Sequence, residues 1–384
     1  MKKLFTRRTV LSVAAIAATA LTLTACDLAP TTIKIGLAQP LSGDLAALGN
    51  DMRNGLQLAV NEVNKKGFKV AGKSVKFEIV AMDDKGSSEE AKKIAQLMVD
   101  SGAVAVIGHL TSDASIQAAP IYAQKNIAQL AISTNPKFTE LGLPTTFRLV
   151  ANDNLQARAV GSYAINRITR NKFAIVDDGS TYGKSLANSV ASILEGKKTI
   201  ALRQSFDEKT KDFAALAAQI KADGIEVVVS TLSDFQVIAL ITELEKIDYS
   251  KQINILGTDA LKTAGMVEHA GKVKNMIATS PVLDVNEFPN GRNFASEYLV
   301  AFKTAPVYAS HYSYDAMYIL AAAIKKADSA DPVKITQTLR SLEGFAPITG
   351  TMRWTDKGEQ REGTVSLYTV RGTQWESVER SKTW

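Results

Sequence analysis

From residue 33 onward, the sequence alternates between short apolar runs and longer amphipathic stretches. The apolar runs predict strands at 33–38, 76–81, 103–108, 128–133, 173–177, 226–231, 253–257 and 276–280. Several are apolar almost throughout, which is typical of parallel strands covered on both faces. The amphipathic stretches repeat apolar residues at spacings of three and four, and they predict helices at 50–64, 88–101, 112–125, 181–195, 212–223 and 234–247. This alternation of strand and helix predicts doubly wound α/β sheets.

Two smaller sheets are expected rather than one large sheet, because 384 residues is about two to three times the usual domain size. A second strand and helix series begins after residue 150. Beyond residue 281 the pattern becomes helical, at 291–304 and 310–327, and it ends in a strand-like run at 364–370. This order predicts a chain that leaves one lobe and later returns to it. We expect lobe 1 to comprise residues 33–150 and 282–362, and lobe 2 to comprise residues 151–281 and 363–384.

The first 26 residues have the features of a bacterial export signal. A basic start precedes an apolar stretch at residues 10–20 and the tail Leu-Thr-Ala-Cys, which is similar to a lipobox ending at Cys26. We therefore expect a periplasmic protein anchored through an acylated Cys26; the alternative is a plain cleaved signal with an incidental Cys. No other Cys is present, so no intramolecular disulfide forms.

The net charge of +6 does not indicate a nucleic-acid partner. The first 26 residues contain four of the 45 basic side chains and none of the 39 acidic ones. The rest of the chain therefore carries 41 basic and 39 acidic groups, and the basicity belongs mostly to the export segment.

Signs of catalysis or of a bound cofactor are weak. The three histidines, at positions 109, 269 and 311, form no His-x-x-x-His pair, so we expect no metal site. No Gly-x-Ser-x-Gly motif is present, and His109 at a strand end is interpreted as structural. The segment 179–185 has three residues between its glycines, where a P-loop requires four. We expect the acidic pairs at 83–84 and 177–178 to cap helices or lie in solvent. The sequence thus predicts neither an enzyme nor a cofactor.

Polar side chains follow the predicted strands, at the sheet edge where open α/β sheets bind ligands. They are Ser42, Thr111, Ser112, Asp113, Ser133, Thr134, Tyr182, Ser233, Asp234 and Asp259. Ser112 at a helix start offers a hydroxyl and free backbone N–H groups to a carboxylate, and Thr134 adds a second hydroxyl. Asp259 offers a negative charge to an ammonium group. Two such half-sites facing each other would recognise an α-amino acid; the alternative is that all of these residues are helix caps.

Four stretches together resemble the periplasmic leucine/isoleucine/valine-binding protein family. They read IKIGLAQPLSGDLAALGNDMRNGLQLAVNEVN, VAVIGHLTSDASIQAAPIYAQKNIAQLAISTNP, AIVDDGSTYGKS and ILGTDA, and the resemblance covers nearly all of residues 33–370 in the same order. It implies a type I periplasmic binding protein, with two lobes joined by a hinge of three crossing segments and a ligand cleft between them. It also implies a monomer that delivers an amino acid to an ABC permease and its ATPase in the inner membrane.

The resemblance assigns roles to individual positions. Ser112 would bind the ligand carboxylate, with Thr134 beside it in the segment that contains Ser133. Ile132 would offer a backbone carbonyl to the ammonium group, which Asp259 would pair. Tyr182 would be a cleft tyrosine of the second lobe.

Other positions depart from the family pattern. Thr111 and Gly86 stand where the leucine binders carry a disulfide, and Leu48 replaces an aromatic residue at the side-chain pocket. Ser233 and Asp234 lie in a pocket segment that lacks an expected tyrosine. We therefore expect an amino acid, branched-chain or otherwise apolar, without naming its side chain. The alternatives are a short amide, urea or another small polar ligand in the same cleft, or a sensor subunit.

Overall fold

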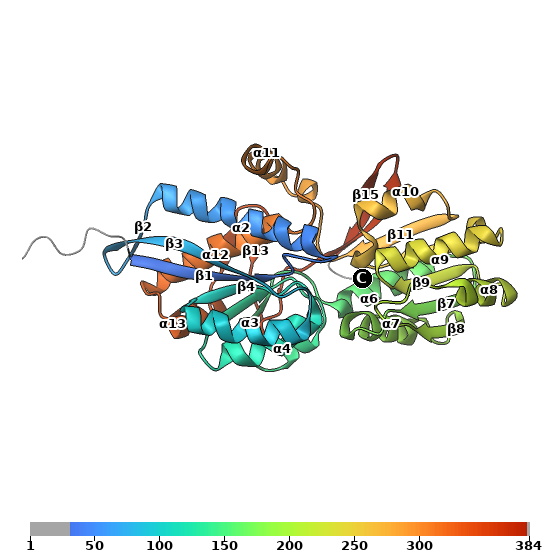
Figure 1. The fold of residues 1–384 in the computed structure, drawn as a ribbon, viewed down its shortest axis with the longest axis horizontal. Helices are drawn as coiled ribbons and strands as arrows, with labels where there is room; N and C mark the ends of the chain where they lie inside the picture. Colours follow the sequence, from blue (N-terminus) through green and yellow to red (C-terminus); the bar gives the residue numbers. More distant parts are fainter. Residues whose placement is uncertain (1–30, 382–384) are drawn as a thin grey trace, which may run out of the picture.

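The computed structural model describes residues 31–381, which form two lobes placed end to end (Figure 1). The first lobe is built on a six-stranded sheet of order β2-β3-β1-β4-β5-β6. Its strands are β1 (Thr31–Gln39), β2 (Phe68–Val70), β3 (Lys73–Asp83), β4 (Ala105–Gly108), β5 (Ala128–Ala131) and β6 (Thr146–Arg148). All neighbours in this sheet are parallel except β2 and β3.

The second lobe contains a seven-stranded sheet of order β15-β14-β11-β10-β9-β7-β8. Its strands are β7 (Lys172–Asp177), β8 (Thr199–Ser205), β9 (Val227–Thr231), β10 (Asn254–Gly257), β11 (Asn275–Ser280), β14 (Val365–Arg371) and β15 (Gln374–Ser381). The first five of these are parallel, whereas β14 and β15 are antiparallel to their neighbours.

Helices cover both faces of each sheet (Figure 1). The helices of residues 31–281 are α2 (Ala46–Lys66), α3 (Ser88–Ser101), α4 (Ser112–Ala123), α5 (Lys137–Glu140), α6 (Asp153–Asn166), α7 (Thr181–Leu194), α8 (Ala214–Ala222), α9 (Asp234–Lys246) and α10 (Ala264–Ala270). The later ones are α11 (Gly291–Phe302), α12 (Ser310–Ala327) and α13 (Pro332–Arg340). Short elements complete the chain: η1 (Ser250–Gln252), η2 (Asp259–Leu261), η3 (Val285–Glu287), β12 (Gly344–Ala346) and β13 (Gly350–Met352).

The burial pattern explains why the strands read as apolar runs. In the second lobe, one apolar cluster lies under α8 and α9 and another under α6 and α7, so the strands between them are buried on both faces. Every residue of β9 is buried. The predicted doubly wound α/β fold with two lobes is confirmed.

The chain passes between the two sheets three times. It leaves the first sheet after β6, returns after β11 so that α12 packs along α2, and enters the second sheet again at β14. The residue bounds of the lobes stay a prediction.

Several elements carry little sequence signal. The edge strands β8 and β15 are largely exposed and polar, so no apolar run marks them. The segments of α6 and α13 are further helices beyond those that the sequence predicts. Within residues 31–381, no helix has the length and apolarity that crossing a membrane requires. The predicted export signal and Cys26 lie outside the described residues.

Candidate functional site

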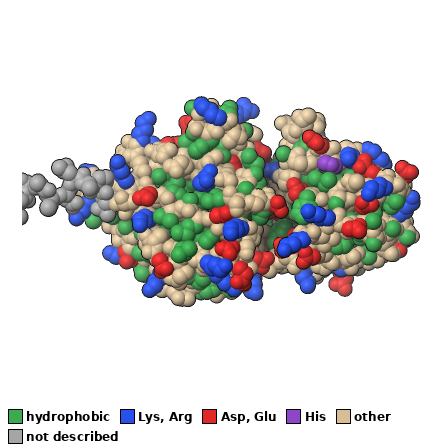
Figure 2. Space-filling view, viewed as in Figure 1, with side chains coloured by type: hydrophobic (Ala, Val, Ile, Leu, Met, Phe, Trp, Pro, Cys, Tyr) green, Lys and Arg blue, Asp and Glu red, His purple; other side chains and the backbone are tan. Residues whose placement is uncertain are grey.

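The two lobes touch where α4 of the first lobe meets α7 of the second. Asp113, in the first turn of α4, accepts hydrogen bonds from the backbone N–H of Thr181, at 3.2 Å, and from its hydroxyl. The side-chain amide of Asn135 donates to the carbonyl of Thr181 at 3.1 Å. A recess with acidic side chains at its edge marks this junction between the lobes (Figure 2). The structure therefore shows the lobes in contact across the predicted cleft.

Asp259 forms the acidic wall in the second lobe. It begins η2 directly after β10, and its Oδ1 accepts from the Tyr182 hydroxyl at 2.6 Å and from Gln156 Nε2 at 2.7 Å. These partners come from α7 and α6, so three elements hold one carboxylate. Burial raises the pKa of Asp259, and the hydrogen bonds from Tyr182 and Gln156 oppose that rise. Asp259 as a whole residue is half-buried.

Ser112 and Thr134 form the opposite wall, in the first lobe. Thr111 caps α4 by accepting from Ala114 N–H at 3.4 Å, which leaves Ser112 as the first helical residue. Ser112 is buried, and its Oγ accepts from the backbone N–H of Asn135 at 3.4 Å. This contact brings the start of α4 beside the segment after β5. A helix N-terminus with adjacent hydroxyls favours an anion such as a carboxylate.

Asp153 joins the two walls. It is the first residue of α6, and its backbone N–H donates to the carbonyl of Thr134 at 2.9 Å. One helical turn later, Gln156 binds Asp259. We call the resulting closed set of residues the cleft ring, which consists of Ser112, Asp113, Thr134, Asn135, Asp153, Gln156, Thr181, Tyr182 and Asp259. The structure thus links Ser112, Thr134, Tyr182 and Asp259 in one set of contacts, and their role in ligand binding stays a prediction.

Buried polar atoms without hydrogen-bond partners occur around the cleft ring. Among the described residues they include Ser133 Oγ, both carboxylate oxygens of Asp153 and Gln156 Oε1. Because buried polar groups in proteins are nearly always paired, such atoms mark a place suited to a polar ligand. Asp153 and Gln156 were not among the predicted site residues. One signal for them was present in the sequence: both are polar and follow directly after the lobe boundary expected at residue 150.

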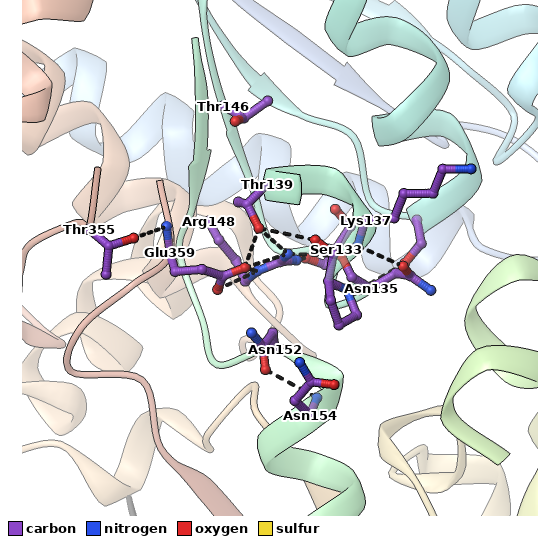
Figure 3. A network of polar contacts seen from close by, with 12 residues as sticks. Ser133, Asn135, Lys137, Thr139, Thr146, Arg148, Asn152, Asn154, Thr355 and Glu359 are labelled. Atoms are coloured by element: carbon purple, nitrogen blue, oxygen red, sulfur yellow. Dashed lines mark hydrogen bonds and ion pairs between the residues drawn. The ribbon is translucent and has the colours of Figure 1, made fainter. Parts of the chain in front are cut away.

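Arg148 holds the segment that carries Ser133, Thr134 and Asn135. Its guanidinium is fully buried and donates to the carbonyls of Ser133 and Asn135 (Figure 3). It also pairs with Glu359 at 3.0 Å, and Glu359 lies on the chain just before it enters the second sheet for the last time. Arg148 therefore fixes the geometry of the first-lobe wall and ties it to the third crossing of the chain. A separation of 211 residues hides this pair from sequence reasoning.

Four further predicted site residues make contacts that a ligand site does not require. Two of them cap helices: Thr111 caps α4, and Ser233 forms a capping box at the start of α9. Asp234 accepts from the Thr263 hydroxyl at 2.7 Å, which links α9 to the start of α10. Leu48 is half-buried in the first turns of α2. None of these contacts tests a role in a side-chain pocket, so that role stays a prediction, as does the carbonyl contact of Ile132.

Thr111 and Gly86 do lie side by side. A Cβ placed on Gly86 would lie 3.8 Å from Cγ2 of Thr111. The two positions are therefore neighbours in space, as the disulfide that the resemblance places there in leucine binders would require.

The remaining motifs have structural roles. His109 is fully buried, with Nδ1 at 2.6 Å from Asp84 and Nε2 at 3.2 Å from the Tyr122 hydroxyl. Ser180 caps α7 by accepting from Gly183 N–H at 2.9 Å, which accounts for the glycine-rich turn. In the part of the chain that the structure describes, no three His, Cys, Asp or Glu side chains group as a metal site would require.

Comparisons with known proteins agree with the two-lobed fold. The model of a family described as "Periplasmic binding protein" matches residues 32–374. A Leu/Ile/Val-binding protein of Rhizobium johnstonii is 28% identical over 91% of this chain and 93% of its own length. The branched-chain amino acid transporter substrate-binding protein LivJ of Streptococcus pneumoniae, solved with isoleucine, has a TM-score of 0.81 at 23% identity, covering 91% of this chain and 99% of that one. A solute-binding protein of Rhodopseudomonas palustris, solved with 3,4-dihydroxybenzoic acid, has a TM-score of 0.78 at 18% identity, covering 91% and 97%.

Proposed function

Because the chain belongs to the periplasmic binding protein family, we propose that it captures an α-amino acid with an apolar side chain for an ABC importer. The observation that carries this proposal is the cleft ring, which sets a helix N-terminus and hydroxyls opposite the carboxylate of Asp259. A zwitterion presents one negative and one positive group and matches both walls. The Leu/Ile/Val-binding relative supports the same ligand class.

Capture follows from the positions of these groups. The ligand carboxylate binds first at the start of α4, where Ser112, Thr134 and backbone N–H groups donate to it. The ammonium group then pairs with Asp259, which Tyr182 and Gln156 hold in place. Closing of the second lobe forms the Asp113 to Thr181 contacts and excludes water. The ligand shifts the open and closed populations because it touches both walls only in the closed state.

The cellular setting is part of the proposal. The protein acts in the periplasm as a monomer, anchored through Cys26, and presents its closed form to a permease with an ATPase. The lobes divide at residues 150/151, 281/282 and 362/363, and these three crossings form the hinge. Mass spectrometry of the processed N-terminus tests the anchor.

Ligands without an ammonium group fit the site less well. The carboxylate of Asp259 would remain unpaired if it faced a neutral amide, urea or an aromatic acid. An unpaired buried charge costs roughly several kcal/mol. No feature of the described residues favours the sensor role over delivery to a permease.

A thermal-shift screen with matched ligands tests the proposal. Leucine, isoleucine and valine would be compared with 4-methylpentanoate, which lacks the ammonium group, and with 3-methylbutylamine, which lacks the carboxylate. A ligand at one hundred times its Kd stabilises the folded protein by about 2.7 kcal/mol, so binding raises Tm. We expect only complete amino acids to raise it. An equal rise with 4-methylpentanoate or with urea would contradict the proposal.

A further inference from the structure

Asp153 is a buried acid that the proposed capture mechanism does not yet use. Asp153 is 1% exposed, and no hydrogen bond of full geometry reaches its carboxylate, which has the Thr134 side chain as a weak partner. Its backbone is bonded to Thr134 of the first-lobe wall, and one turn of α6 separates it from Gln156, which binds Asp259. Asp153 therefore lies between the carboxylate-binding wall and the ammonium-binding wall.

The charges around Asp153 disfavour its ionised form. Burial comes first and the negative charge of Asp259 second, and together they raise the pKa of Asp153 to about 8. Glu359 acts in the same direction, whereas Thr134 and Arg148 oppose it. Arg148 compensates little, because its guanidinium already pairs with Glu359 and two backbone carbonyls.

The other titratable groups nearby face Asp259. They are Tyr182 on α7, Tyr308 before α12 and Lys262 after η2. The pKa values of both tyrosines are raised well above the ordinary value of 10.0, so these hydroxyls stay protonated near neutral pH. Burial lowers the pKa of Lys262, whose Nζ lies 4.0 Å from Asp284 at the second crossing.

We infer that Asp153 is a second acid at the ammonium site, protonated in the free protein and ionised in the complex, so that capture of an amino acid releases a proton. This inference rests on the proposed function. An ammonium group has three N–H donors, which match Asp259, Asp153 and the carbonyl predicted at Ile132. When the ligand binds, the O–H bond of Asp153 breaks and its proton leaves to solvent. The resulting carboxylate accepts a hydrogen bond from the ammonium group.

The consequence is a pH-dependent affinity. Below pH 8 the ligand must displace the proton of Asp153, so the association constant rises with pH. It increases by about tenfold per pH unit between pH 6 and 7 and levels off above pH 8. At pH 7 binding therefore releases most of one proton per ligand.

Calorimetry in two buffers measures this proton directly. Leucine would be titrated into the mature protein at pH 7 in phosphate and in Tris, whose ionisation enthalpies differ, and the difference in heat counts the protons. Asp153→Asn keeps the shape of the side chain but holds no exchangeable acid, so it should bind leucine with no proton release and no pH dependence. Asp248→Asn, the same change at an exposed position of lobe 2, should behave as the parent.

Two results would overturn the inference. One is binding of leucine without proton exchange in the parent protein, which would leave the proposed function intact. The other is proton release that persists in Asp153→Asn, which would assign it to another group such as Lys262. Carbon-13 NMR of the free protein gives a readout that needs no ligand: a carboxyl that titrates near pH 8 must disappear in Asp153→Asn, and titration of Asp153 near pH 4 would refute the inference.

Discussion

Replacing Asp259 by Asn removes one charge and very little else. The Asn side chain keeps an Oδ1 that accepts from Tyr182 and Gln156, so the contacts at 2.6 and 2.7 Å survive. The change therefore separates the charge of the cleft ring from its shape. A hydrogen bond to a charged group contributes about 1.5–3 kcal/mol, and about 1.4 kcal/mol corresponds to a factor of ten. We expect Asp259→Asn to weaken amino-acid binding by roughly 10- to 150-fold.

The free protein should tolerate this substitution well. Burial raises the pKa of Asp259, which means that its charge is unfavourable in the folded state without a ligand. The Tm without ligand should therefore stay equal to that of the parent or rise. Isothermal titration calorimetry with leucine and scanning calorimetry without it measure both quantities, and Asp248→Asn serves as the exposed control.

Binding of leucine by Asp259→Asn within about threefold of the parent affinity would refute the role of this charge. A large drop in Tm would refute it too, because the variant would then lose affinity only by unfolding. A neutral ligand that gains affinity in the variant would point to the amide or urea alternative.

Three further predictions concern the rest of the site. Ser112→Ala should weaken binding by about 1 kcal/mol, roughly fivefold in Kd, because the backbone donors at the start of α4 remain; calorimetry that finds parental affinity would argue against this carboxylate site. Arg148→Met should lower the free energy of unfolding by about 3–5 kcal/mol, because Glu359 and the carbonyls of Ser133 and Asn135 lose a buried partner. A loss below about 1 kcal/mol, measured by urea unfolding, would contradict the positioning role of Arg148. For Asp153 the folded pKa of about 8 exceeds the unfolded value of about 4, so the folded state binds more protons than the unfolded state between these pH values. The stability of the free protein therefore falls as the pH rises, by up to about 1.4 kcal/mol per pH unit. Asp153→Asn lacks this slope and should gain stability relative to the parent from pH 5 to pH 8; a constant difference in urea unfolding at the two pH values would exclude it.

Local patterns were enough to predict the fold class and to propose candidates for the site. A strand that is buried on both faces must be apolar along its length, and a helix that covers it must repeat apolar residues every three or four positions. Because ligands bind at the carboxyl ends of such strands, position along the chain placed Ser112, Thr134, Tyr182 and Asp259 among ten candidates, and the family resemblance then assigned their roles. The edge strands β8 and β15 escaped prediction, since exposed strands need no apolar run.

The sequence by itself determined which chemical groups this protein presents, namely hydroxyls at a helix start and an acid after a strand. Only the tertiary structure decided how they combine. It paired Arg148 with Glu359 across 211 residues, joined Gln156 to Asp259 across 103 residues, and assigned Thr111 and Ser233 to caps. It also buried Asp153 beside Asp259, and the pKa of a carboxyl group depends on its desolvation and on the charges around it, which are properties of a place in the fold rather than of a residue in a chain.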